Sequence, residues 1–181
     1  MRSKRRKQKE VFYVELRTAG DVPLMLYPSV RKKITDGLRW SCDKRGLRIY
    51  DYSILPDRVL MIANVAWGSL DDVIDSFMEF SSKAVMLILR RGVPGRNSAW
   101  MIPALQEFGP AGKPGGVFIW SEEPQIWSLF RQEDIDAKSE QILQAAVKTG
   151  LVKKAEDYLC SSSNPFHPLE GWVVEAVDPW S

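Results

Sequence analysis

The sequence predicts an α+β fold, in which an antiparallel β-sheet carries helices on one of its faces. The chain has 181 residues, the size of one ordinary domain, and 45% of them are hydrophobic, which is enough for a buried core. Segments that alternate in hydrophobicity are interspersed with segments of helical periodicity. Their order is strand, helix, two strands, helix, a strand-like piece and helix, which favours an antiparallel sheet over a parallel one.

The first two elements are predicted from side-chain type and spacing. Residues 11–16, Val-Phe-Tyr-Val-Glu-Leu, are mostly β-branched or aromatic and predict a strand. Val30, Ile34 and Leu38 recur at helical spacing, with lysines and arginines between them. We expect this helix to end before Gly46.

A hairpin and a long helix follow. Residues 47–55 alternate as a half-buried strand does, and residues 59–65 form a second, more apolar run. Pro56-Asp57 separates the two runs, so we expect them to pair as a hairpin. Ser69 is a plausible N-cap for a helix that ends near Arg91.

The second half of the chain is less regular. Residues 92–117 contain four prolines and six glycines and predict a long loop. Residues 118–120, Phe-Ile-Trp, are expected to return to the core. A last helix is predicted from about Glu133 to Thr149, closed by Gly150. Residues 164–181 form a C-terminal extension that contains proline and tryptophan.

The charge is unevenly distributed. Residues 1–9 hold six of the 25 basic residues and no acid, so we expect residues 1–10 to be a basic flexible tail. The remainder has 19 basic and 23 acidic residues. A basic first third favours an anionic partner, although a solvated tail beside an ordinary mixed surface explains the same charges.

Composition excludes several classes of protein. Cys42 and Cys160 are too few for a disulfide framework or a zinc ribbon, and His167 is the single histidine. No apolar run is long enough to span a membrane, and no apolar segment follows the basic N-terminus as it would in a secretory signal. The composition therefore favours a cytoplasmic protein without a membrane partner.

Four segments, in this order, resemble the IS200-like transposases, particularly the REP-associated tyrosine transposases. Residues 12–18, Phe-Tyr-Val-Glu-Leu-Arg-Thr, are similar to the family's first strand. Residues 54–62 lie where the family has its MPNHVHLL signature. Residues 141–152 and 156–162 resemble its YIxxNPVKAGLV segment and its YxxSS ending. The resemblance covers residues 11–163 and implies a ferredoxin-like, HUH-type domain in a bacterial protein, and a homodimer.

The resemblance also implies a chemistry. Members of the family attack a phosphodiester of single-stranded DNA with a tyrosine on the last helix. Two histidines at i and i+2 on a strand hold a Mg or Mn ion beside the scissile phosphate. A polar residue one turn after the tyrosine completes the metal site.

None of these chemical positions is intact here. The two histidine positions are Arg58, which is cationic, and Leu60, which has no donor atom. The nucleophile position is Gln141 and the polar position is Ala145. We therefore predict a transposase-like fold without the reaction, with no metal and no other cofactor.

Nucleic-acid binding is the function we expect to be retained, with DNA that is single-stranded or a hairpin. An arginine in place of a metal ligand can contact a phosphate directly, but Arg58 can equally pair with Asp51 or Asp57. The tryptophans near the long loop, Trp100, Trp120 and Trp127, can stack on unpaired bases, although core packing explains most tryptophans equally well. The basic residues expected to contact nucleic acid are Arg17, Arg31, Lys32, Lys33, Arg39, Lys44, Arg45, Arg48 and Arg58.

Two alternatives remain open. The acidic balance of residues 10–181 favours an interaction or structural protein that no longer binds nucleic acid. An active transposase would need a relocated site built on another tyrosine. The tyrosines available are Tyr13, Tyr27, Tyr50, Tyr52 and Tyr158.

Overall fold

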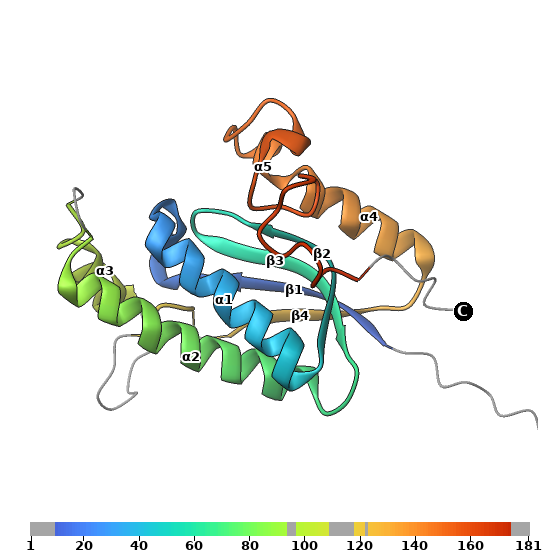
Figure 1. The fold of residues 1–181 in the computed structure, drawn as a ribbon, viewed down its shortest axis with the longest axis horizontal. Coiled ribbons are helices and arrows are strands. Elements are labelled where there is room, and N and C mark those ends of the chain that lie inside the picture. Colours follow the sequence, from blue (N-terminus) through green and yellow to red (C-terminus); the bar gives the residue numbers. More distant parts are fainter. Residues whose placement is uncertain (1–9, 94–96, 109–117, 122, 175–181) are drawn as a thin grey trace, which may run out of the picture.

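A four-stranded antiparallel sheet in the order β2-β3-β1-β4 organises the chain (Figure 1). The structure is a computed structural model and describes residues 10–93, 97–108, 118–121 and 123–174. The predicted α+β class and the antiparallel sheet are confirmed.

The three central strands correspond closely to the predicted ones. β1 (Val11–Arg17) pairs with β3 (Arg58–Val65), and β3 also pairs with β2 (Leu47–Ile54) as the expected hairpin. A register shift between Ile49 and Asp51 marks a bulge in β2. β3 is buried throughout its interior because both faces of the sheet are covered.

Two long helices cover one face. α1 (Pro28–Arg45) ends before Gly46, as predicted, and Gly46 adopts the left-handed conformation with φ 73°. α2 (Leu70–Arg91) packs beside α1, and both bury their apolar stripes against the sheet (Figure 1). No helix in the described part of the chain is long and apolar enough to cross a membrane.

The expectation that the helices lie on one face was wrong for the last helix. α4 (Gln132–Leu143) and the short α5 (Ala145–Lys148) pack on the opposite face, with Gln144 between them. Helical periodicity identifies an apolar stripe but not which face of a sheet the stripe covers. The near-continuous burial of β3 required cover on both faces.

The region after α2 also differs from the expectation. Residues 92–117 were expected to be loop throughout, but Met101–Phe108 form a helix, α3. Pro103 lies in its first turn, where a missing N–H costs no hydrogen bond. Trp120 is fully buried as expected and forms a bridge with Thr18, whereas the fourth strand, β4 (Gln125–Leu129), was not predicted.

The C-terminal segment lies along the outer edge of β2. Ser161 and Val173 form single bridges with Ser53 and Ile49, respectively, and Leu169 is fully buried in the core that α1 and α2 cover. A single-turn helix, η3 (Ala155–Asp157), precedes this segment. Residues 164–174 of the expected extension are therefore packed on the domain.

His167 gives this edge a pH dependence. Its Nδ1 lies 3.1 Å from the hydroxyl of the buried Tyr52, and burial lowers the pKa of His167 below the usual value near 6.5. Because the folded state disfavours the charged imidazole, stability is fully present above about pH 6.5 and decreases as the pH falls through it. We expect the loss of stability between about pH 7.5 and 5.5 to be smaller in His167→Gln than in the unmodified chain, measured by urea unfolding. Equal losses would contradict this.

Candidate functional site

The candidate site lies on the sheet face that α4 covers, between β1 and β3. In the antiparallel register Tyr13 lies opposite Ile62, Glu15 opposite Leu60, and Arg17 opposite Arg58. Side chains alternate along a strand, so Tyr13, Glu15 and Arg17 point to this face. The same alternation places Arg58 and Leu60 on it.

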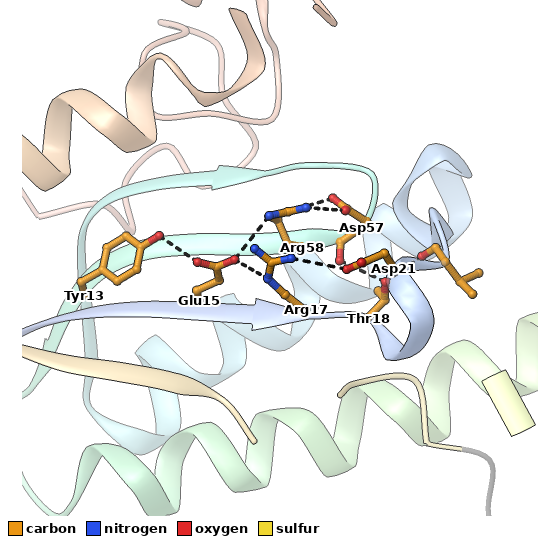
Figure 2. A network of polar contacts seen from close by, with 8 residues as sticks. Tyr13, Glu15, Arg17, Thr18, Asp21, Asp57 and Arg58 are labelled. Atoms are coloured by element: carbon orange, nitrogen blue, oxygen red, sulfur yellow. Dashed lines mark hydrogen bonds and ion pairs between the residues drawn. The ribbon is translucent and has the colours of Figure 1, made fainter. Parts of the chain in front are cut away.

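A buried carboxylate joins three of these side chains (Figure 2). Glu15 Oε2 accepts a hydrogen bond of 3.1 Å from the Tyr13 hydroxyl, and Oε1 accepts one of 2.7 Å from Arg17 Nε. Arg58 Nη1 lies 3.4 Å from the same Oε1. Arg58 also donates to both carboxylate oxygens of Asp57, at 3.0 and 2.7 Å. Arg17 Nη1 lies 3.6 Å from Asp21 Oδ1.

The charges of this network are largely neutralised within it. The side chain of Glu15 is 9% exposed, that of Arg58 24% and that of Arg17 39%. Two guanidinium groups face three carboxylates, so the local net charge is −1. Such an arrangement rigidifies the junction of β1 and β3 but leaves Arg58 little freedom to contact a phosphate. Of the two partners considered for Arg58, the structure selects Asp57.

Asp51, the other partner considered for Arg58, is hydrogen-bonded to two serines instead. Its Oδ2 accepts a hydrogen bond of 2.7 Å from Ser139 Oγ, and its Oδ1 lies 3.3 Å from Ser162 Oγ. Burial raises the pKa of Asp51, and the two serine hydroxyls act in the opposite direction. Asp51 therefore connects β2 with α4 and with the C-terminal segment.

The other positions implied by the resemblance form a closed contact between sheet and helix. Leu60 (5% exposed) and Ala145 (7% exposed) belong to one apolar cluster with Ile142. Gln141 is exposed, and its Oε1 accepts a hydrogen bond of 3.0 Å from Lys138 Nζ. Leu60 and Ala145 thus lie at the same sheet–helix junction, whereas Gln141 is exposed on α4.

The side chains at these positions do not fit a divalent cation. Leu60 and Ala145 offer no donor atom, and Arg58 is a cation. Within the described ranges, no group of three or more histidine, cysteine, aspartate or glutamate residues is arranged to hold a metal ion. His167 contacts Tyr52, which packs in the core under α1 and α2.

Burial makes three tyrosines poor nucleophiles. It raises the pKa of Tyr13 and of Tyr52 well above 10, and that of Tyr158 to about 12. The Tyr13 hydroxyl donates to Glu15, and the Tyr158 hydroxyl donates to Ile54 O at 2.7 Å. These phenols therefore serve as structural donors in the neutral form.

An aromatic and cationic cluster between the sheet and α4 was not predicted from the sequence. The ring of Trp127 on β4 stacks on that of Tyr13, with centroids 5.3 Å apart, and Lys138 Nζ lies 4.3 Å from the Tyr13 centroid. Nor was Glu15 predicted as the centre of the network. The available signal was a lone acid in an apolar strand, since buried carboxylates require partners.

The nine basic residues expected to contact nucleic acid do not share one surface. Arg17 and Arg58 lie on the α4 side of the sheet, and Arg48 lies on β2 opposite Asn64. The remaining six lie on α1, across the sheet: Arg31, Lys32, Lys33, Arg39, Lys44 and Arg45. Of the three tryptophans considered for stacking, Trp120 is fully buried, whereas Trp100 and Trp127 are both 47% exposed.

Comparison with solved structures places the chain in a fold class. It is similar to a REP-associated tyrosine transposase bound to a REP hairpin, with a TM-score of 0.56 and 16% identity over 98% of this chain and 94% of that one. The fold implied by the resemblance is therefore confirmed: the chain has a transposase fold of the REP-associated tyrosine type.

A second solved structure is that of a putative transposase from Deinococcus radiodurans R1. It aligns with a TM-score of 0.42 and 18% identity over 80% of this chain and 96% of that one. No protein-family model and no curated protein sequence matches the chain.

Proposed function

We propose that this protein binds single-stranded or hairpin DNA through a transposase fold and does not form the covalent phosphotyrosine bond. The observation that supports the absence of the reaction is that Leu60, Ala145 and Ile142 are buried in one apolar cluster. An apolar contact occupies the place where the resemblance requires a metal ion and a polar ligand. The DNA partner is supported by the hairpin bound to the protein of similar fold.

Restoring the nucleophile alone is expected to leave the protein inactive. Gln141→Tyr places a phenol on the exposed face of α4, but its pKa near 10 keeps it neutral, and no cation polarises the phosphate. After incubation with labelled single-stranded DNA and manganese, a denaturing gel should show no covalent adduct with Gln141→Tyr. An adduct from the unmodified chain would overturn the proposal, and mapping its tyrosine would locate a relocated site.

DNA binding itself is tested by fluorescence anisotropy with hairpin and linear single strands. Affinity should fall steeply between about 50 and 200 mM salt, because cations of the protein displace counterions from phosphates. Deleting residues 1–9 removes six of these cations and should reduce the salt dependence.

An interaction protein without nucleic-acid binding is the second candidate. The observation that favours it is the network around Arg58, where the guanidinium group is already hydrogen-bonded to the carboxylates of Asp57 and Glu15. Absence of binding to both DNA probes at the lower salt concentration would favour this candidate and contradict the first.

A further inference from the structure

An exposed aromatic pair lies on the outer surface of α1 and α2, across the sheet from Arg58. The rings of Trp40 on α1 and Phe80 on α2 have centroids 6.2 Å apart and planes within 14° of each other. Trp40 is 41% exposed and Phe80 is 43% exposed. The two partly exposed rings therefore form an apolar aromatic patch on the surface of α1 and α2.

The pair is held in place by a close approach of the two helices. Gly37 lies one turn before Trp40, and a Cβ atom added there would lie 3.0 Å from Phe77 Cε2 and 3.3 Å from Phe80 Cδ1. The absence of a side chain at Gly37 therefore lets the Phe80 ring lie against α1 beside Trp40. Phe77 is fully buried beneath.

Lysines flank the pair along α1. Lys33, Gly37, Trp40 and Lys44 are spaced at i, i+4, i+7 and i+11 and so form one stripe on the helix. Lys33 and Lys44 are both exposed. At about 1.5 Å per residue, they lie roughly 10 Å before and 6 Å after Trp40.

This surface carries more unneutralised positive charge than the sheet face. α1 has six cations and two acids, Asp36 and Asp43, a net charge of +4, and α2 has three cations and four acids, a net charge of −1. Asp36 is shared by Lys32 and Arg39, Asp43 contacts Lys44, and Lys33 forms no ion pair with any residue that the structure describes. The network around Arg58 has a net charge of −1.

We propose that the Trp40–Phe80 pair is a stacking platform for unpaired bases of a single-stranded nucleic acid, and that Lys33 and Lys44 contact its phosphates. Flat aromatic surfaces beside cations are how proteins bind single strands without reading sequence. This inference rests on the proposed function. It assigns nucleic-acid binding to the α1 and α2 side of the sheet, opposite the face that holds Arg58 and Leu60.

The positive charge of α1 argues against a second copy of this chain as the partner that covers the Trp40–Phe80 pair. A two-fold symmetric contact would place the same cationic stripe against itself. Repulsion between two helices of net charge +4 opposes such a dimer, whereas a polyphosphate strand is complementary to the stripe.

The test uses the full chain and a fluorescein-labelled oligothymidylate of about 12 nucleotides, followed by anisotropy. Trp40→Ala should weaken binding about tenfold, the effect of losing one stacked base, and Trp40→Phe should retain most of the affinity. Lys33→Ala should reduce the slope of log K against log salt by about 0.7, the value for one phosphate on a single strand.

Trp127→Ala is the matched control. It removes a tryptophan of similar exposure from the opposite face and should leave the affinity unchanged. Binding that is weakened by Trp127→Ala but not by Trp40→Ala overturns the inference and leaves the proposed function standing. No binding by any form of the protein overturns the proposed function itself. A concentration-dependent dimer that is lost in Trp40→Ala, measured by sedimentation, also overturns the inference.

Discussion

Glu15→Ala is expected to lower the free energy of unfolding by about 3 kcal/mol. The substitution removes the acceptor shared by the Tyr13 hydroxyl and the guanidinium groups of Arg17 and Arg58. Removing one partner of a buried ion pair typically costs 3–5 kcal/mol, and the lower value applies because Arg17 can turn to solvent and Arg58 keeps Asp57. Urea unfolding measures the effect.

Two variants calibrate this expectation. Arg58→Ala should cost only about 1 kcal/mol, because Glu15 keeps two donors. Asp134→Ala removes an exposed ion pair between the first turn of α4 and Arg131, and it should change the stability only slightly. A Glu15→Ala protein as stable as Asp134→Ala would show that the buried network does not stabilise the sheet.

Leu60→His, which restores a histidine of the resembled family, is expected to destabilise the fold by about 2–3 kcal/mol at neutral pH. The imidazole would replace an apolar side chain of the cluster that holds Ile142 and Ala145, and neither of these two neighbours offers a partner for its nitrogens.

Leu87→His is the control for this prediction, because Leu87 is 54% exposed on α2. It should change the stability little. A Leu60→His protein that is as stable as Leu87→His would mean that the junction is open enough to accept a metal ligand. In that case Arg58→His with Leu60→His and Gln141→Tyr becomes a reasonable route to an active site.

The sequence by itself determined the elements whose signals are local. The strand-forming residues of β1, β2 and β3, the apolar stripes of α1 and α2, and the end of α1 before Gly46 all depend on neighbouring residues, and the structure confirms them. The loss of metal ligands is also a local property, because Leu60 and Ala145 have no donor atom in any fold.

The elements that the sequence did not reveal depend on long-range contacts. β4 is a strand because its backbone pairs with β1 from an edge, and its five residues alternate too weakly to predict this. α3 forms in a proline-rich and glycine-rich segment, and it contacts the first 3₁₀ turn, η1 (Ala19–Asp21), some eighty residues earlier.

The tertiary structure alone decided how the charges are used. Arg17 and Lys33 are equal as cations in the sequence, but the register of β1 places Arg17 beside the buried Glu15, whereas α1 presents Lys33 to solvent. Coulomb interactions depend on distance and burial, and both are set by strands and helices far apart in the chain. For this reason only the tertiary structure showed that the exposed face of α1 carries positive charge that the buried carboxylate of Glu15 does not neutralise.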